Sequence, residues 1–135
     1  MMQFEQIKPD QLLPADYYWL ARGCEGSHDG ATSQHQVEAA IKGNAFIFRV
    51  SGDMEGIFVL SVGDRELREV VMTALAGKGM TKHFDEFYFK VKELCKGTDC
   101  KRLSGFVSRP GLKRLYERRT QAKAKATLFV DSLEG

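Results

Sequence analysis

A pair of glycines near the middle of the chain has the spacing of an anion-binding turn. Residues 76–81 have the sequence AGKGMT, in which Gly77 and Gly79 stand directly before the most regular helical pattern of the chain. Glycine lets the backbone approach a ligand closely, and the first N–H groups of a helix favour an anion. Lys78 and Lys82 would add positive charge. A G-x-G turn is also typical of a plain connector, so the spacing leaves both interpretations open.

Carboxylates and imidazoles supply the candidate general bases. Glu66 and Glu69 stand at the start of an apolar segment, where a partly desolvated carboxylate can accept a proton directly or through water. His28 and His35 lie in and just after a polar loop, and imidazole titrates in a useful pH range. Each of these side chains can instead be solvated surface, which is the commoner role of a charged residue at a strand start.

Several classes of protein are excluded by composition. The three cysteines, Cys24, Cys95 and Cys100, are an odd number without a zinc-binding spacing, so we expect neither a disulfide framework nor a metal site. No apolar run approaches the length of about 18 residues that a membrane span needs, and no signal-peptide pattern is present. We therefore expect a cytoplasmic protein that has no membrane partner.

The net charge of +2 hides an asymmetry between the two halves of the chain. Residues 1–69 carry six basic and eleven acidic side chains, whereas residues 70–135 carry fourteen basic and seven acidic ones. A polyanion, whether a phosphorylated cofactor or a nucleic acid, should therefore meet the second half. Seven basic residues lie in the segment 109–125, but no DNA-reading motif accompanies them. Solvated surface is thus favoured over nucleic-acid binding for this run, while Arg109 and Arg114 could also meet the phosphates of a cofactor.

Apolar and β-branched runs predict the strands. We expect strands at residues 4–7, 45–50, 56–62, 101–108 and 122–133. The turn Ser51-Gly52-Asp53 should join two of them into an antiparallel hairpin. Residues 67–75 fit both a strand and a helical stripe, although the β-branched residues within them favour a strand.

Apolar spacings of three and four residues predict the helices. Asp10 or Asp16 can cap a first helix, which carries the consecutive aromatic residues Tyr17, Tyr18 and Trp19. Because consecutive residues cannot share one helix face, some of these rings should line a binding cleft or a subunit contact, or lie on the surface.

Three further helices follow. Thr32 or Ser33 caps a helix with Val37, Ala40 and Ile41 on one face. Residues 81–96 form the clearest helix, with Asp85 and Glu86 in its first turn, and a last helix begins at Pro110 and contains Leu112, Leu115 and Tyr116. The element order describes one domain over residues 1–135, a mixed α/β sheet with mostly antiparallel strands and helices on both faces.

This order and three local features resemble the GNAT superfamily of acyl-CoA-dependent N-acetyltransferases over essentially the whole chain. The first feature is the turn with Gly77 and Gly79, which resembles the family's loop Q/R-x-x-G-x-G/A for the coenzyme A pyrophosphate. The second is Leu115-Tyr116-Glu117-Arg118, which is similar to the family's late L-Y-E-K/R helix. The third is the segment 66–75, where the resemblance implies a strand splayed from the strand at 101–108.

The resemblance implies an acetyl-CoA-dependent N-acyltransferase acting on an amine of a small molecule or a protein. Tyr116 would protonate the departing thiolate, although it can instead simply pack beside its apolar neighbours, and Glu69 would be a general base. A backbone N–H within residues 71–73 would polarise the thioester carbonyl. The residues expected to bind acetyl-CoA are Val71, Met72, Thr73, Gly77, Lys78, Gly79, Met80 and Lys82.

Three positions depart from the family's pattern. Ala74 stands where the family has Gln or Arg, Arg109 stands where it has Asn, and Thr120-Gln121 replaces a Gly-Phe pair. Short GNAT-like proteins of tailed bacteriophages have this degenerate appearance. The alternative is therefore a noncatalytic GNAT-like phage protein that serves in interaction or virion assembly, in the host cytoplasm and as a homodimer.

Overall fold

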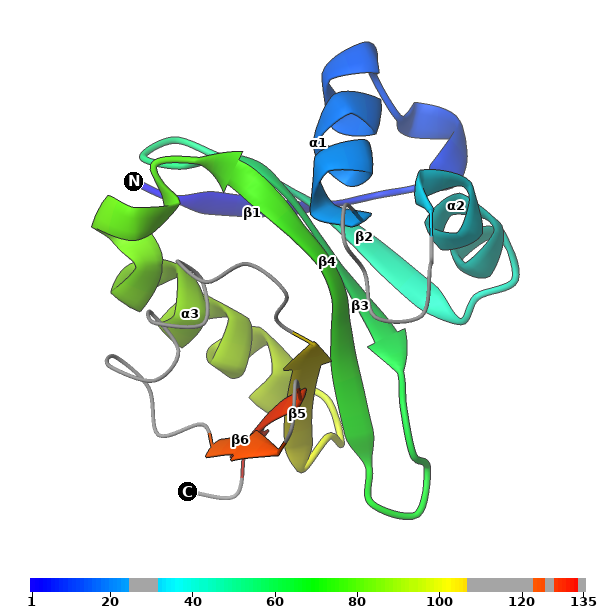
Figure 1. Ribbon diagram of the computed structural model, residues 1–135, viewed down its shortest axis with the longest axis vertical. Helices are drawn as coiled ribbons and strands as arrows, with labels where there is room; N and C mark the ends of the chain where they lie inside the picture. Colours follow the sequence, from blue (N-terminus) through cyan, green and yellow to red (C-terminus); the bar gives the residue numbers. More distant parts are fainter. Residues whose placement is uncertain (25–31, 107–122, 126–127, 134–135) are drawn as a thin grey trace.

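The computed structural model describes residues 1–24, 32–106, 123–125 and 128–133 (Figure 1). Its strands are β1 (Gln3–Ile7), β2 (Ala45–Ser51), β3 (Glu55–Val62), β4 (Glu69–Lys78), β5 (Arg102–Phe106), β6 (Lys123–Lys125) and β7 (Leu128–Ser132). Its helices are α1 (Pro14–Cys24), α2 (Ser33–Ile41) and α3 (Met80–Lys96), with a short 3-10 helix (Pro9–Gln11) before α1. Within the described ranges, no helix is long and apolar enough to cross a membrane.

The strands form one mixed sheet in the order β1-β2-β3-β4-β5-β7-β6. Every neighbouring pair is antiparallel except β4 and β5, which are parallel and are connected through α3. Helices α1 and α2 cover one face of the sheet and α3 covers the other (Figure 1). The predicted fold class, a mostly antiparallel mixed sheet with helices on both faces, is confirmed.

Successive side chains of β3 point to opposite faces of the sheet and pack into the core on each face. Ile57 and Val59 are fully buried on the face that Leu20 of α1 covers, whereas Phe58 is fully buried on the α3 face. There the Phe58 ring meets the Phe87 ring of α3 edge to face, with 5.4 Å between centroids. Burial of one such side chain contributes about 1.5–3 kcal/mol to the free energy of unfolding. Because β3 buries side chains on both faces, it stabilises both cores.

Helix α3 has the boundaries that its apolar spacing predicts to within one residue. Phe84, Phe87 and Val91 are completely buried against the sheet. The helix begins one residue earlier than expected because Gly79, at φ +82°, forms its N-cap. The expectation of acidic residues in the first turn is wrong, because Asp85 and Glu86 follow a departure from helical geometry at His83 (φ −112°, ψ 18°).

The two N-terminal helices begin with side-chain caps. Asp16 lies inside the first turn of α1, where its Oδ2 accepts the N–H of Leu13 at 2.8 Å, so it caps the helix from within. The predicted cap of α2 is confirmed, since Thr32 Oγ1 accepts the N–H of His35 at 3.4 Å. The predicted apolar face of α2 is wrong at Ile41, which is 70% exposed at the end of the helix.

The C-terminal segment differs from the expected single strand at 122–133. It contains two antiparallel strands, β6 and β7, which pair Lys123 with Val130 and Lys125 with Leu128. The alternation of apolar and polar residues has the same period in both strands, so it does not mark the turn between them. The helix expected from Pro110 lies outside the described residues, as do the last two residues of the strand expected at 101–108.

Candidate functional site

The parallel pairing between β4 and β5 is short. It runs from Glu69 paired with Arg102 to Met72 paired with Gly105. From Ala74 to Lys78, β4 pairs with β3 and with no other strand that the structure describes. One edge of β4 therefore offers backbone N–H and C=O groups to an extended ligand, at the place where the resemblance predicts the two strands to part.

A β-bulge marks the same point on the other side of β4. Val59 of β3 pairs with Ala74 and Leu60 pairs with Met72, so Thr73 is an extra residue in β4. A bulge bends its strand and redirects the local backbone groups. It lies at the end of the three residues, 71–73, that are expected to carry the N–H donor for a thioester carbonyl.

Three side chains connect this bulge to its surroundings on the α1/α2 face of the sheet. Thr73 Oγ1 donates a hydrogen bond to Gln36 Oε1 of α2 at 3.0 Å, and it lies 3.3 Å from Ser61 Oγ of β3. Gln36 is only 5% exposed, and its neighbours on α2 that contact the sheet, Val37 and Ala40, are apolar. We name Gln36, Thr73 and Ser61 the bulge triad.

Glu69, the predicted general base, lies on the same face of β4 as Thr73, four residues before it. Two polar side chains of β5 surround its carboxylate. Its Oε2 accepts a hydrogen bond from Ser104 Oγ at 2.8 Å, and Arg102 Nε lies 3.2 Å away. Arg102 Nε is within ion-pair distance but has no hydrogen bond of acceptable angle. The Glu69 side chain is 15% exposed, so it retains limited contact with solvent while two groups on β5 hold it.

The glycines of residues 76–81 have different roles from each other. The expectation that residues 76–81 form a loop is wrong except at Gly79, because β4 extends through Lys78 and α3 begins at Met80. Gly77 pairs with Gly56 of β3. A Cβ atom on Gly77 would lie 2.6 Å from the Glu55 carbonyl oxygen, so strand packing requires this glycine. Gly79 is the residue that requires a left-handed conformation, and it directly precedes the first N–H groups of α3.

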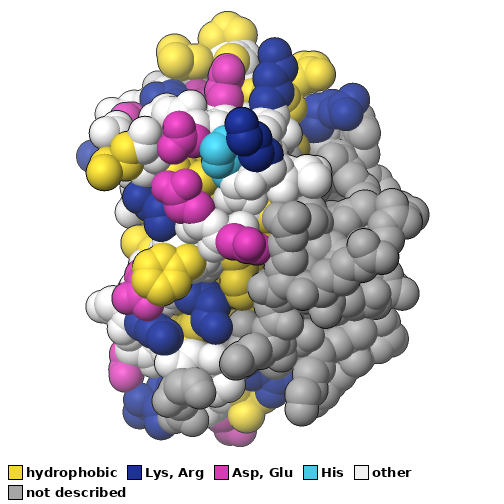
Figure 2. Space-filling model, turned by 90° about the vertical axis from the view of Figure 1, so that its left-hand side faces the viewer, with side chains coloured by type: hydrophobic (Ala, Val, Ile, Leu, Met, Phe, Trp, Pro, Cys, Tyr) yellow, Lys and Arg dark blue, Asp and Glu magenta, His cyan; other side chains and the backbone are white. Residues whose placement is uncertain are grey.

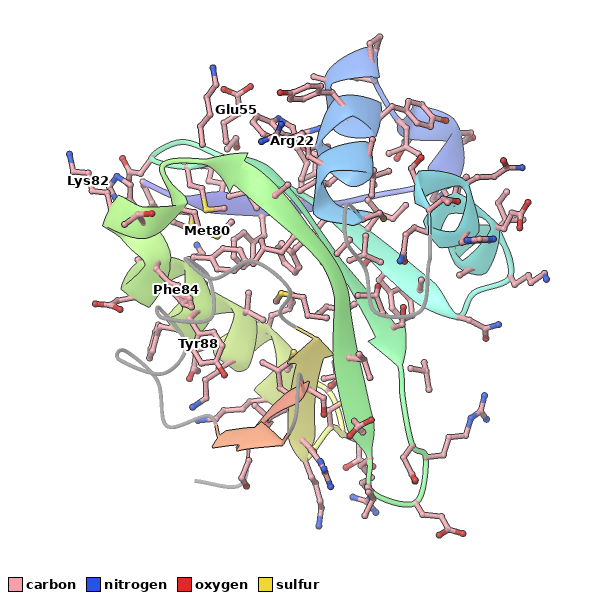
Figure 3. The ribbon with its side chains drawn as sticks, viewed as in Figure 1. Arg22, Glu55, Met80, Lys82, Phe84 and Tyr88 are labelled. Atoms are coloured by element: carbon pink, nitrogen blue, oxygen red, sulfur yellow. The ribbon has the colours of Figure 1, made fainter. Side chains whose placement is uncertain are left out.

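Basic side chains lie near the C-terminal end of β4, together with Glu55 of β3, which is paired with Lys78. Lys78 ends the strand and Lys82 lies in the first turn of α3, and both are exposed. Figure 3 shows Arg22, from the last turn of α1, and Lys82 on either side of the end of β4. Met80, the remaining predicted cofactor-binding residue, is half-buried against the α3-side core. The start of α3 therefore places the N-terminal end of a helix next to cationic side chains.

The other candidate bases and aromatic residues do not join this arrangement. His35 Nδ1 accepts the N–H of Thr32 at 3.0 Å in the cap of α2, and Glu66 is exposed in the loop between β3 and β4. Tyr17 and Tyr18 are about half exposed on α1, whereas Trp19 packs against the core. His28, Arg109, Arg114 and Tyr116 lie outside the described residues.

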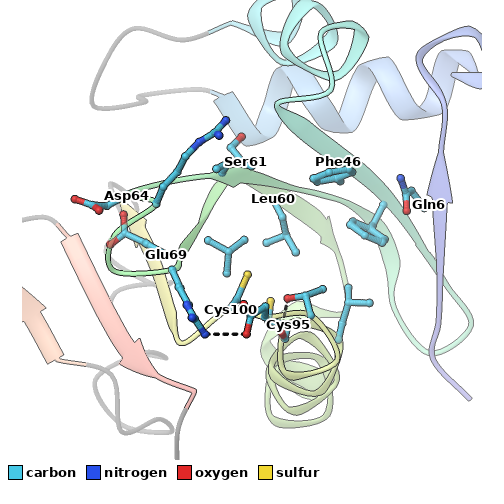
Figure 4. A pocket seen from close by; sticks show the side chains of 16 residues that line it. Gln6, Phe46, Leu60, Ser61, Asp64, Glu69, Cys95 and Cys100 are labelled. Atoms are coloured by element: carbon cyan, nitrogen blue, oxygen red, sulfur yellow. Dashed lines mark hydrogen bonds and ion pairs between the residues drawn. The ribbon is translucent and has the colours of Figure 1, made fainter.

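A hollow of about 680 Å³ lies at the opposite end of β4, and Glu69 and Ser61 are among the residues that line it (Figure 4). It is mostly apolar, with Phe46, Leu60 and Leu94 in its wall, and an ion pair of 2.9 Å between Arg68 and Asp99 lies at its margin. None of the residues expected to bind acetyl-CoA lines it. Burial, together with the nearby Cys100, raises the pKa of the Cys95 thiol in its wall to about 12, so this thiol stays protonated at neutral pH.

The residues of the bulge triad and the partners of Glu69 were not among the predicted site residues. A local signal was present for Gln36, since it stands four residues before Ala40 and thus on the apolar side of a predicted helix. For Ser61, Ser104 and Arg102 the only signal is polarity inside apolar strands. Their partners are fixed by sheet register, which is not a local property.

Comparisons with known proteins agree on the fold. No protein-family model and no curated sequence matches the chain. Among solved structures, the chain is similar to variant forms of the spermidine/spermine N-acetyltransferase from Vibrio cholerae, with 8% identity and a TM-score of 0.68 over 98% of this chain and 95% of that one.

Two more solved structures show the same likeness. The IAA acetyltransferase from Bacillus cereus has 10% identity and a TM-score of 0.66, over 98% of this chain and 99% of that one. A GNAT-family acetyltransferase from Staphylococcus aureus has 9% identity and a TM-score of 0.59, over 99% and 100%. The chain thus has the fold of the GNAT acetyltransferases.

Proposed function

We propose that the chain is an acetyl-CoA-dependent N-acyltransferase of the GNAT type. The observation that carries the proposal is that two features adjoin at the end of β4, an open strand edge and the N-terminus of α3. The edge that opens after Met72 leads directly into the glycine-capped start of α3. An extended pantetheine amide chain fits an open strand edge, and a pyrophosphate fits a helix N-terminus flanked by Lys78 and Lys82.

The reaction needs a donor for the thioester oxygen, a base and an acid. The amine nitrogen attacks the carbonyl carbon, the carbon–sulfur bond breaks, and coenzyme A leaves as a thiolate. An N–H of residues 71–73 would stabilise the negative charge that develops on the carbonyl oxygen. Glu69 would take the amine proton, directly or through water, and Tyr116 would give a proton to the thiolate.

The polar environment of Glu69 supports its part in this scheme. Ser104 and Arg102 fix the carboxylate on the face of β4 that α2 also covers, which is the face from which an amine of a small molecule or a protein would approach. A carboxylate held in place in this way would act as a base for an amine that binds within hydrogen-bond reach of it.

Thermal unfolding with and without acetyl-CoA tests the proposal. Binding to the native state alone raises the free energy of unfolding by RT ln(1 + [L]/Kd), about 2.7 kcal/mol at one hundred times Kd. We expect the midpoint to rise by several degrees in millimolar acetyl-CoA, and less in the same concentration of ADP, which lacks the pantetheine arm.

The alternative function predicts a different result. A noncatalytic GNAT-fold protein that serves in interaction or virion assembly is compatible with Ala74 and Arg109, which depart from the family's pattern. Such a protein would show no midpoint shift with acetyl-CoA and would form a defined oligomer instead. Absence of a shift in millimolar acetyl-CoA would therefore overturn the proposed enzyme.

A further inference from the structure

We infer that Gln36 is a positioning residue which, through the side chain of Thr73, sets the orientation of the backbone of β4 that polarises the thioester. The inference rests on the proposed function and adds a residue from α2 to it. It starts from the bulge triad, whose members come from three different elements, α2, β3 and β4.

The first step concerns what a bulge leaves undetermined. An extra residue interrupts the ladder between two strands, so the regular pairing no longer fixes the direction of the backbone at that residue. At the opposite edge of β4, the pairing with β5 ends at Met72, one residue before Thr73. Thr73 therefore stands where regular strand pairing constrains the backbone least on both sides, among the described strands.

The second step concerns what replaces that constraint. Thr73 Oγ1 donates to Gln36 Oε1 at 3.0 Å and lies 3.3 Å from Ser61 Oγ, so one hydroxyl connects the bulge to a helix and to the neighbouring strand. Threonine has few χ1 rotamers, and each rotamer is compatible with a limited range of φ and ψ, so holding its hydroxyl restricts the backbone at this residue. The side-chain bonds thus hold the backbone that the ladder does not.

The third step explains why a glutamine lies on this face of α2. A helix that packs on an apolar face needs only apolar side chains there, and Val37 and Ala40 meet that need. A side-chain amide that is 5% exposed is costly unless it is hydrogen-bonded. Its bond to Thr73 satisfies the amide oxygen and ties α2 to the bulge.

The test uses acetyl-CoA with a ¹³C label in the acetyl carbonyl and needs no acceptor amine. A hydrogen bond to the thioester oxygen lowers the carbonyl stretching frequency, so isotope-edited infrared spectroscopy of the bound molecule reports the orientation of the donor. The variants are Thr73→Val, which keeps the shape without the hydroxyl, and Gln36→Met, which keeps the length without the amide. Thr73→Ser should restore the wild-type spectrum.

Thr98→Val is the matched control. Thr98 Oγ1 donates to the Cys95 carbonyl at the end of α3, so this variant loses a comparable hydroxyl bond outside the bulge. We expect Thr73→Val and Gln36→Met to lose at least half of the frequency shift, and Gln36→Met to do so while the Kd for acetyl-CoA changes less than threefold. Thr98→Val and Thr73→Ser should keep the whole shift.

The outcomes separate the two proposals. If wild-type protein binds acetyl-CoA with a shifted carbonyl band that both variants retain, Gln36 has no positioning role and the proposed function stands. If both variants lose the shift and the affinity together, the triad is structural and the inference is overturned. If the wild-type protein does not bind acetyl-CoA, the proposed function fails and the inference fails with it. Should one variant not fold, the other alone decides, since they remove opposite ends of the same bond.

Discussion

Asp16 shows how one buried carboxylate joins a helix to the sheet. Its side chain is almost fully buried, and Arg49 of β2 contacts it through Nη2 at 2.6 Å and Nε at 3.0 Å. Burial by itself raises the pKa of Asp16, but the hydrogen bonds from Arg49 and the Leu13 N–H outweigh it, so the pKa lies below its usual value. The ionised form is therefore favoured by folding.

The pH dependence of stability follows from that direction. A lowered folded-state pKa stabilises the protein above the unfolded pKa of Asp, near 4, and this contribution is lost as pH falls through the folded pKa. We expect Asp16→Asn to lower the free energy of unfolding by about 1–3 kcal/mol at pH 7, because Arg49 loses its buried partner and keeps only the exposed Glu5. Urea unfolding should show the difference from wild type shrinking as pH falls below 4. The exposed Asp10→Asn should match wild type throughout, and a constant difference at all pH values would contradict the assignment.

The resemblance to the GNAT superfamily implies that Tyr116 is an acid, and this role can be tested by substitution. If its phenol protonates the departing thiolate, Tyr116→Phe removes the acid but keeps the ring. We expect turnover, measured as release of coenzyme A thiol with the best of a panel of amines, to fall at least tenfold. The stabilisation by acetyl-CoA should stay the same. An equal loss of turnover and of acetyl-CoA affinity would make Tyr116 a packing residue.

At the scale of elements, the sequence predicts those helices and strands whose apolar residues repeat with a clear local period. Helix α3 and the β2–β3 hairpin have strong periods of 3.6 and 2, and both are confirmed. The extension of β4 through Gly77 is not local, because it depends on Gly56 lying opposite across the sheet. The position of the bulge at Thr73 is likewise a property of two strands, so the candidate site could be predicted in its backbone segments but not in its side-chain partners.

The two glycines at the end of β4 should therefore respond differently to alanine. At Gly77 the new Cβ would lie 2.6 Å from a backbone oxygen, and at Gly79 it would be strained by φ +82°. We expect the free energy of unfolding to fall by about 2–3 kcal/mol in Gly77→Ala and by about 1–2 kcal/mol in Gly79→Ala. Gly97→Ala, with no atom nearer than 3.4 Å, should stay close to wild type in urea unfolding.

Acetyl-CoA distinguishes the two glycines further. The stabilisation that it confers should persist in Gly77→Ala, because that residue lies within paired strands. It should shrink in Gly79→Ala, because that residue sets the start of α3. The reverse pattern would show that the helix start does not contact the ligand.

At the scale of the whole molecule, the sheet separates a mainly apolar face from a face that also holds buried polar groups. The α3 side holds the larger apolar core, with the rings of Phe58, Phe84 and Phe87 fully buried. The α1/α2 side holds a smaller core together with the bulge triad and Glu69. Because the polar groups have their own face of the sheet, they are satisfied without interrupting the main apolar core.

The distribution of charged side chains over the surface is also a property of the whole molecule. Acidic and basic side chains are interspersed over the described surface in Figure 2, and along α3 basic residues such as Lys82 and Lys96 alternate with acidic ones such as Glu86 and Glu93. The described part of this face therefore lacks the continuous basic surface that tracks a nucleic-acid backbone. A small polyanion bound at the start of α3 would be attracted mainly by the charges near it, since screening limits the interaction to about 10 Å at 0.1 M salt.

This local attraction predicts a modest dependence of acetyl-CoA binding on salt. Between 50 and 500 mM NaCl we expect the Kd, measured by titration calorimetry, to rise about tenfold, as expected when a few charges are screened. Lys82→Gln should weaken binding about threefold and reduce the salt dependence. Lys96→Gln removes the same charge from the other end of α3, where the Lys96 Nζ atom lies 3.8 Å from a Glu93 carboxylate oxygen, and should change neither quantity. A steeper salt dependence for a DNA duplex, together with tighter binding of the duplex than of acetyl-CoA, would instead assign the basic run at 109–125 to a nucleic acid, because duplex binding releases one counterion for nearly every phosphate contacted.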